Sequence, residues 1–432
     1  MYVRTISSPN YKFNPINVSP LAHFLNTKSS KLVYNSPIYK SGFCNSVKRV
    51  SEKPMFLKNN GGLIGIRCDG SFGKDEKDSE NSFYMRRALE LAKKATGHTS
   101  PNPLVGCVIV NDGKIVGEGF HPKAGQPHAE VFALRDAGNL AENGTAYVTL
   151  EPCNHYGRTP PCSEALIKAK VKNVVVGMVD PNPIVASKGV DKLRATGIIV
   201  TVGVEEDMCK KLNEGYIHQM LTGKPLVTLR YTLSVNGCLT DQLGEEVVAP
   251  GGYYSKILQE YDAVILSSTL LAKTSSLPLS NEPGANQPLK IVIAKSSSSQ
   301  FQIPIATNES TSKVIVFTDK EMDLGSQTAQ QGIETVVLEK ISLLAILEYC
   351  KGLGLCSVLL DLRGDILELE ETLREGFEQS LIQKVAVEVL PEWDISKEEV
   401  LPVTLKNLGK GLKLKNLTSQ ISGNIVLLEG YF

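Results

Sequence analysis

The sequence has no net charge, few aromatic residues and no long apolar run. Lys plus Arg and Asp plus Glu both number 46, aromatic residues make up 6% of the chain, and Trp occurs once. A chain without excess positive charge has no general attraction for the phosphates of nucleic acids or for anionic membranes. The longest apolar runs, such as 174–179, have the length of a strand and are too short to span a membrane. These features argue against both a nucleic-acid partner and a membrane location.

Acidic residues are missing from the first 51 positions, which contain nine Ser and seven Lys or Arg. Organellar transit peptides are Ser-rich, basic and poor in acidic residues, whereas a secretory signal needs a compact apolar segment after a basic start. We therefore expect residues 1–75 to be a transit peptide and disordered linker. A disordered N-terminus with no targeting role is the alternative that composition leaves open.

The nine Cys residues are scattered and odd in number, so they do not form the paired framework of a disulfide-rich protein. We expect most of them to be reduced thiols. The 432 residues, 42% of them hydrophobic, are too many for one typical core and predict two globular domains.

Hydrophobic periodicity predicts an α/β domain over 79–225. Residues 83–92 have helical spacing, and Ser79 is the expected N-cap. Val and Ile runs flank the turn residues 111–113 and indicate a β-hairpin. The remaining expected elements are helices at 129–137 and after Cys162, and strands at 146–150 and 174–179.

Turn residues at 222–225 interrupt the pattern, and we expect a domain boundary there. Alternation of strands and helices then resumes, which predicts a second α/β domain over 226–432. Its expected strands lie at 226–231, 263–266, 290–293, 314–317 and 358–360.

Two short segments carry the residue types of a catalytic zinc site. The first contains His128 and Glu130, and the second contains Cys153 and Cys162. One imidazole and two thiolates leave the fourth tetrahedral position of Zn²⁺ open for water. Zinc lowers the pKa of such a water from about 16 to about 7, which makes a nucleophile available at neutral pH. Glu130 is placed to carry protons between this water and a leaving ammonia.

The His-x-Glu and Pro-Cys parts agree with the signature of zinc-dependent nucleobase deaminases, but the second cysteine does not. Eight residues separate Cys153 from Cys162, where the signature has two. Either the loop between the ligands is enlarged or Cys162 is not a ligand. We interpret the insert, with His155 and Arg158, as a substrate loop able to contact an anion. The alternative is that His128 and the two Cys are ordinary buried residues without a metal. We interpret Cys107, on an expected strand, as a core residue and not a ligand.

The run from Asn102-Pro103-Leu104-Val105-Gly106-Cys107 to Asp180-Pro181-Asn182-Pro183, with the long Pro-Cys-x8-Cys loop, resembles the pyrimidine deaminases of riboflavin biosynthesis. This resemblance implies a cytidine-deaminase-like α/β/α sandwich. It also implies deamination of 2,5-diamino-6-(5-phosphoribosylamino)pyrimidin-4(3H)-one to 5-amino-6-(5-phosphoribosylamino)uracil and ammonia.

By matching motif, the resemblance implies that zinc is held by His128, Cys153 and Cys162 and that Glu130 is the proton shuttle. It further implies a substrate pocket lined by Asn102, His121, His155, Arg158, Asp180 and Asn182. Each of these pocket residues could instead stabilise a loop; 180–183 is a plausible turn in its own right.

The second half resembles, more weakly, the dihydrofolate-reductase-like NADPH-dependent reductase that follows the deaminase in many relatives. The sequence departs from that of the reductase at positions where catalytic and cofactor-binding residues are expected. Arg230 replaces a Lys, 272–276 has no carboxylate, and bulky Leu362 and Arg363 stand in the glycine-rich turn meant for cofactor phosphate. We therefore expect no cofactor other than zinc, and an inactive domain that serves as a scaffold or dimerisation unit.

With the acid-poor N-terminus, this arrangement is similar to the plant plastid deaminase of riboflavin synthesis, which implies a chloroplast location. A bifunctional deaminase-reductase, a nucleic-acid editing deaminase and a non-catalytic zinc-bearing interaction protein are the alternatives. The neutral charge disfavours the nucleic-acid reading, and the intact Glu130 disfavours the non-catalytic one.

Overall fold

The computed structural model describes residues 72–432 except for 157–159, 184–185, 244, 275, 296–312, 321–332, 365 and 395–411. The predicted transit peptide therefore lies outside the described residues up to position 71. Two β-sheets, each covered by helices, are formed by the chain on either side of the turn at 223–225. The α/β class expected from the periodicity is confirmed. In the part of the chain just defined, no helix is long and apolar enough to cross a membrane.

The first sheet has five strands in the order β2-β1-β3-β4-β5. β1 pairs antiparallel with both β2 and β3, whereas β3, β4 and β5 run parallel. The strands are β1 (Gly106–Asn111), β2 (Lys114–Phe120), β3 (Thr145–Leu150), β4 (Asn173–Met178) and β5 (Ile199–Val202).

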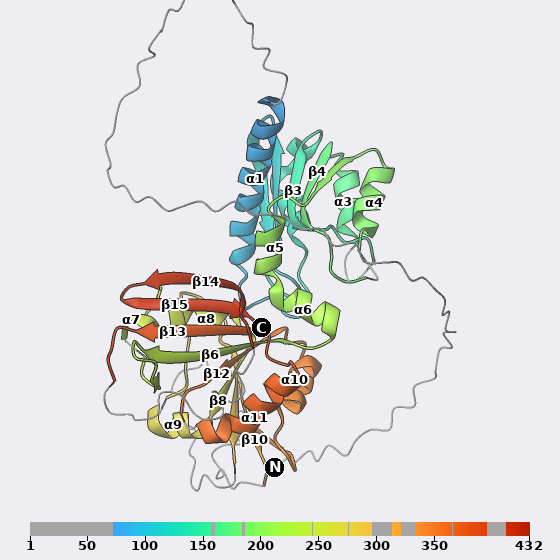
Figure 1. Ribbon diagram of the computed structural model, residues 1–432. Helices are drawn as coiled ribbons and strands as arrows, with labels where there is room; N and C mark the ends of the chain where they lie inside the picture. The colour runs from blue at the N-terminus through green and yellow to red at the C-terminus, as the bar shows by residue number, and fades with distance from the viewer. Residues whose placement is uncertain are drawn as a thin grey trace, which may run out of the picture. The chain divides into compact units, whose positions relative to one another are not determined.

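Helices cover both faces of this sheet and make it the middle layer of a sandwich. α1 and α5 pack together on one face, and α2, α3 and α4 form a row on the other (Figure 1). The helices are α1 (Phe72–Lys93), α2 (Ala129–Ala137), α3 (Cys162–Lys168), α4 (Lys188–Ala195), α5 (Glu206–Leu212) and α6 (Glu214–Thr222), with a 3₁₀ turn at Gly138–Ala141.

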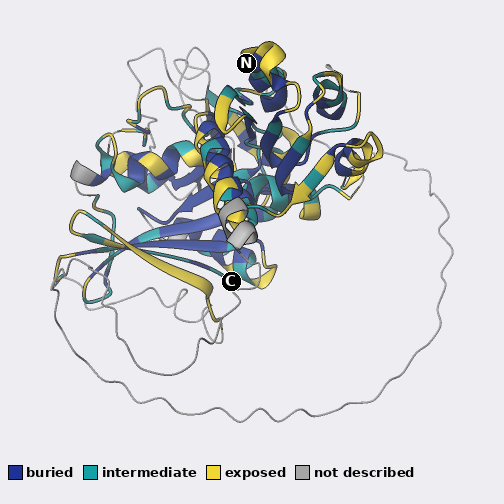
Figure 2. Ribbon diagram, turned by 90° about the horizontal axis from the view of Figure 1, so that it is seen from above, coloured by how far each residue is buried: buried dark blue, intermediate teal, exposed yellow. Residues whose placement is uncertain are grey.

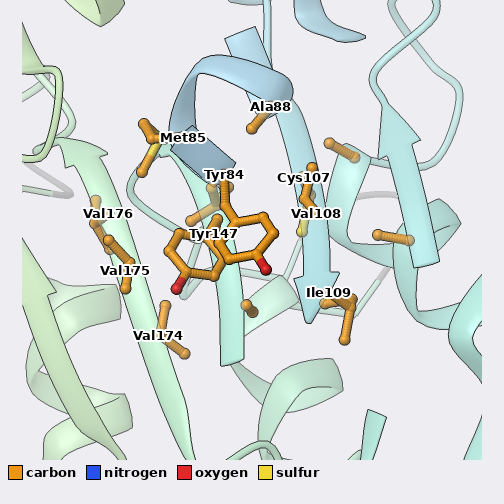
Figure 3. Close-up of a cluster of buried hydrophobic side chains, with 14 of the residues drawn as sticks. Tyr84, Met85, Ala88, Cys107, Val108, Ile109, Tyr147, Val174, Val175 and Val176 are labelled. Carbon is orange, nitrogen blue, oxygen red and sulfur yellow. The ribbon is translucent and has the colours of Figure 1, made fainter. Parts of the chain in front are cut away.

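The core between α1 and the sheet is built from alternate strand residues and one helix face. Met85 and Ala88 of α1 pack in this core with Val108 of β1 (Figure 3). The two layers approach closely at Gly106, where a Cβ atom would lie 1.9 Å from the carbonyl oxygen of Ala88. Only glycine therefore fits at this crossing.

The first helix begins earlier than predicted. α1 starts at Phe72, so Ser79 lies inside the helix, and its expected role as the N-cap is wrong. The helix therefore extends about two turns before Ser79 and begins within the range 1–75 that was expected to be transit peptide and linker.

The second sheet is larger, with the strand order β11-β10-β9-β8-β12-β6-β13-β15-β14 and β7 paired to β6. Its central strands are parallel, and β15 and β14 add an antiparallel edge. Figure 2 shows buried central strands, whereas β14 is exposed along almost its whole length. The strands are β6 (Leu226–Ser234), β7 (Leu239–Thr240), β8 (Ala263–Ser267), β9 (Leu289–Ala294), β10 (Val314–Thr318), β11 (Ile333–Val337), β12 (Ser357–Asp361), β13 (Lys384–Leu390), β14 (Lys415–Ser422) and β15 (Ile425–Tyr431).

Side chains along β8 alternate between two separate cores, because successive strand residues point to opposite faces. Ala263 and Ile265 contribute to the core under α10 and α11, and Val264 and Leu266 to the core under α8 and α9. This sheet is therefore also covered on both faces. Its helices are α7 (Glu245–Val248), α8 (Tyr253–Glu260), α9 (Ser268–Thr274), α10 (Leu343–Gly352) and α11 (Ile366–Glu378).

Candidate active site

One imidazole and two thiol groups converge where α2 and α3 begin. His128 is the N-cap of α2, Cys153 follows β3, and Cys162 is the first residue of α3. The His128 Nδ1 atom lies 3.5 Å from Cys153 Sγ and 3.4 Å from Cys162 Sγ, and all three donor atoms lie within 4.8 Å of one another. Tetrahedral zinc with Zn–S of about 2.3 Å and Zn–N of about 2.0 Å places ligand atoms at similar separations. The donor set fits Zn²⁺ in both chemistry and spacing.

The contacts among these three groups shift the pKa values of the two thiols in a way that suits metal ligation. The hydrogen bond from Cys162 and the neighbouring His128 together lower the pKa of Cys153 to about 4, against the effect of burial. The pKa of Cys162 is raised by the same hydrogen bond and by burial. A thiolate is therefore already favoured at Cys153, which is the form that binds a metal.

Glu130 lies in the first turn of α2, two residues after His128, and is 3% exposed. Its Oε2 atom is buried and has no hydrogen-bond partner among the described residues. Burial, together with the charge of Cys153, raises the pKa of Glu130 to about 7. A carboxyl group that changes protonation near neutral pH beside an open metal site is suited to carry protons.

Asn102 and His121 form a hydrogen-bonded pair beside the predicted zinc ligands. Asn102 Nδ2 lies 3.0 Å from His121 Nε2, and His121 Nδ1 lies 3.1 Å from the carbonyl oxygen of Pro127. The His121 ring meets the His128 ring edge-to-face, with centroids 5.4 Å apart. Burial lowers the pKa of His121, which favours the neutral ring, and both of its nitrogens are engaged by these two contacts.

A second group of predicted pocket residues follows β4. Asp180 accepts a 2.9 Å hydrogen bond from the backbone N–H of Asn182, which closes a tight turn. His155 is exposed and close enough to Asp180 to influence the pKa of that carboxyl, which burial raises. Arg158, predicted to contact a phosphate, lies outside the described residues.

Sequence reasoning missed two residues that contact this group. The Tyr216 hydroxyl of α6 lies 3.5 Å from Asp180 Oδ1, and no motif marked it. Glu151 is buried and accepts hydrogen bonds from backbone groups around Asp180. Its position directly before Pro152 and Cys153 was a signal that could have drawn attention to it.

A separate network of buried charges lies at the carboxyl end of β12 in the second sheet. Asp361, the last residue of β12, is paired in register with Arg230 of β6, and their side chains form a 3.0 Å ion pair. Arg230 Nε also donates a 2.8 Å hydrogen bond to Glu388. The Arg363 guanidinium binds Asp361 and the hydroxyl of Tyr254, with its carbon 4.6 Å from the centre of that ring.

These five side chains are buried, and their two cations and two carboxylates balance. In open α/β sheets, ligands bind outside the carboxyl ends of the parallel strands. Here Asp361 and Arg363, at this end of β12, are both buried. The residues that sequence analysis singled out as departures, Arg230 and Arg363, both belong to this network.

Residues 78–178 match the family described as the cytidine and deoxycytidylate deaminase zinc-binding region. The chain is 60% identical over 365 residues to the chloroplastic riboflavin biosynthesis protein PYRD of Arabidopsis thaliana, covering 83% of this chain and 84% of that protein. It is 38% identical over 362 residues to the riboflavin biosynthesis protein RibD of Synechocystis, covering 81% and 95%.

Two solved structures are also similar to this chain over most of its length. A Thermotoga maritima structure described as a diaminohydroxyphosphoribosylaminopyrimidine deaminase/5-amino-6-(5-phosphoribosylamino)uracil reductase superposes with a TM-score of 0.70 at 29% identity, covering 82% of this chain and 99% of that one. RibD of Acinetobacter baumannii gives a TM-score of 0.66 at 34% identity with the same coverage.

Proposed function

The chain belongs to the RibD and PYRD family of riboflavin biosynthesis proteins, and from this premise we propose that it is a zinc-dependent, monofunctional pyrimidine deaminase. The proposed reaction converts 2,5-diamino-6-(5-phosphoribosylamino)pyrimidin-4(3H)-one to 5-amino-6-(5-phosphoribosylamino)uracil and ammonia. The observation that carries the proposal is the convergence of His128, Cys153 and Cys162 with the buried Glu130 beside them. The fold is a cytidine-deaminase-like α/β/α sandwich followed by a reductase-like α/β domain, which we divide at 225.

In this mechanism His128, Cys153 and Cys162 hold the metal. Zinc supplies, when bound, the Lewis acidity that makes a water nucleophile available near neutral pH. Glu130 takes a proton from the attacking water and passes it to the departing amine, so the C–N bond breaks as ammonia leaves. The raised pKa of Glu130, about 7, lets the same carboxyl serve as base and then as acid.

The remaining predicted residues position the substrate. Asn102 and His121, held together by their hydrogen bond, face the pyrimidine from the His128 side. Asp180 and Asn182 offer a carboxylate and an amide, which suit ribose hydroxyls. His155 and Arg158 suit the phosphate.

We propose that the C-terminal domain has no reductase activity. The support is the buried network around Asp361, of which Asp361 and Arg363 lie at the carboxyl end of β12. A cofactor phosphate approaching the turn after β12 would have to displace the Arg363 side chain, which is 5% exposed. The bifunctional alternative is favoured by one observation, that a similar Thermotoga maritima protein is described as both deaminase and reductase.

We further propose that the protein acts in the chloroplast stroma on a small-molecule substrate, with its C-terminal domain as a scaffold or dimerisation unit. The plant relatives are named chloroplastic, and the acid-poor first 51 residues have the composition of a transit peptide. The chain has no excess of positive charge that would attract nucleic acids.

The test is to measure ammonia release and NADPH consumption together, with the zinc-loaded protein and the diaminopyrimidine ribosyl phosphate. Ammonia without loss of NADPH supports the monofunctional deaminase, and consumption of both supports the bifunctional alternative. If a protein that retains stoichiometric zinc gives neither ammonia nor NADPH consumption, the result supports a non-catalytic zinc-bearing interaction protein.

A further inference from the structure

Glu151 is a buried carboxylate that accepts four hydrogen bonds from the backbone of one distant segment. Its Oε1 atom accepts from the N–H groups of Gly189 at 2.9 Å and Val190 at 3.2 Å. Its Oε2 atom accepts from Asp180 at 3.2 Å and Ser187 at 2.9 Å. The side chain is 5% exposed, so its charge is balanced by these donors and not by solvent.

Two of these bonds supply a cap that α4 does not make for itself. The N-terminal N–H groups of a helix need acceptors from outside the helix. Ser187, the N-cap of α4, has a left-handed backbone with φ 63°, and its side chain makes no capping bond. The Glu151 side chain makes the capping bonds that the Ser187 side chain does not make. Its negative charge also interacts favourably with the N-terminus of the helix.

The packing leaves no room for adjustment at this point. A Cβ atom on Gly189 would lie 1.9 Å from the carbonyl oxygen of Pro152, so the start of α4 rests directly on the Pro152-Cys153 peptide. Asn154 adds a second link, because its Nδ2 atom donates to the carbonyl oxygen of Lys188 at 3.3 Å.

The same residue continues the strand that leads to a zinc ligand. The backbone N–H of Glu151 donates to Met178 at 2.9 Å and so extends the pairing of β3 with β4. Cys153 follows two residues later. Glu151 therefore joins the Cys153 side of the site to the turn that carries Asp180 and Asn182.

We propose that Glu151 is a positioning residue that sets the distance between the metal site and the Asp180–Asn182 turn. This inference rests on the proposed deaminase function. Loss of the Oε2 bonds frees the turn from the strand end, whereas His128, Cys153, Cys162 and Glu130 keep their own supports. The expected consequence is weaker substrate binding with little change in chemistry once substrate is bound.

The test compares Glu151→Gln with Glu151→Asp and a matched control, all in the full chain. Gln keeps one acceptor oxygen but presents an NH₂ group to two N–H donors, and Asp keeps both oxygens on a shorter side chain. Thr149→Val is the control because Thr149 lies in β3 two residues before Glu151, is fully buried and accepts one hydrogen bond, from Gly106 N–H at 3.1 Å. The Thr149→Val variant loses a buried hydrogen bond, but none of the bonds between Glu151 and the Asp180–Asn182 turn is changed.

For Glu151→Gln we expect KM, and the Kd of the product measured by equilibrium titration, to rise about tenfold or more, the size that a buried donor left unpaired produces. Its kcat and zinc content should stay near the wild-type values. Glu151→Asp should fall between Gln and the wild type, and Thr149→Val should bind like the wild type. Amide hydrogen exchange at Asp180, Ser187, Gly189 and Val190 should quicken most in Glu151→Gln and stay at the wild-type rate in Thr149→Val.

Unchanged Kd in Glu151→Gln, or loss of zinc together with kcat, would overturn the inference and make Glu151 a general support of the fold. The product titration and the exchange measurement do not need turnover. If the wild type binds the product but releases no ammonia, the proposed function fails, while weaker binding and faster exchange in Glu151→Gln would still establish the positioning role.

Discussion

Asn102 and His121 are joined by a 3.0 Å contact between Nδ2 and Nε2. An amide NH₂ group can only donate, so His121 Nε2 is the acceptor and its proton resides on Nδ1, which faces the Pro127 carbonyl at 3.1 Å. This pairing holds His121 in one neutral tautomer beside His128. The consequence is a fixed orientation of the His121 ring and of the Asn102 amide in the predicted pocket.

Replacing Asn102 with Asp should raise the pKa of His121, because a carboxylate at this distance favours the charged imidazolium. In the wild type, burial lowers that pKa. The pH titration of the His121 ring followed by NMR measures the change, and kcat/KM should fall with it. Asn111→Asp, in which the amide contacts only backbone oxygens near 140–142, is the control. An unmoved His121 titration in Asn102→Asp would contradict the tautomer assignment.

Glu130→Gln should lower kcat by about 10²–10⁴, the range that a lost general acid–base costs, and leave zinc bound. Gln fills the same buried space but cannot carry a proton. Steady-state ammonia release and metal analysis check both parts. Glu142→Gln, at an exposed carboxylate paired with Lys170, should keep full activity. Turnover close to that of the wild type in Glu130→Gln would remove Glu130 from the mechanism.

Cys162→Ala should lose most of its zinc, because two protein ligands no longer make a stable tetrahedral site. Cys107→Ala should keep its zinc, since Cys107 is equally buried on β1 but lies outside the His128 group. Metal content per chain after dialysis against a weak chelator distinguishes the two. Retention of zinc by Cys162→Ala would show that the ligand set includes another residue.

The buried Asp361 network should make stability depend on pH in the acidic range. Burial raises the pKa of Asp361, but the charges of Arg363 and Arg230 outweigh burial and hold it at about 2, below the ordinary 3.8. A depressed carboxylate pKa stabilises the fold above pH 3.8, and that stability is lost as pH falls through 3.8 toward 2. The loss is about 2 kcal/mol at 1.36 kcal/mol for each pKa unit.

Urea unfolding of the wild type and Asp361→Asn at several pH values measures this effect. The gap in unfolding free energy between them should be widest at neutral pH and narrow as pH falls below 3.8. A gap independent of pH would mean that Asp361 does not carry the ionic stabilisation.

Gly106→Ala should destabilise the first domain by about 1–3 kcal/mol, the cost of overpacking, because its Cβ would collide with the Ala88 carbonyl of α1. Gly352→Ala is the matched control. No atom lies within 4 Å of its added Cβ, and Ala is the better helix former, so this variant should be neutral or slightly stabilising. Thermal unfolding of both variants decides whether the α1–β1 contact is as close as described.

Sequence periodicity was sufficient for most of the elements that position the site. The strands predicted at 146–150 and 174–179 agree with β3 and β4 within one residue, because buried strands leave a contiguous apolar signature. The N-cap at Ser79 was wrong, since a polar residue that can cap a helix is also tolerated inside one when its neighbours favour helix.

The residue types of His128, Glu130, Cys153 and Cys162 by themselves predicted the class of chemistry, because a zinc site with an open position needs that set of donors and a proton carrier. The spacing of the two Cys left open whether Cys162 is a ligand. The tertiary structure decided which distant groups serve them. Glu151 meets residues 29 to 39 positions away, and Arg230 meets Asp361 only because β6 and β12 pair in one register. Such contacts depend on strand order and register, which local periodicity does not encode.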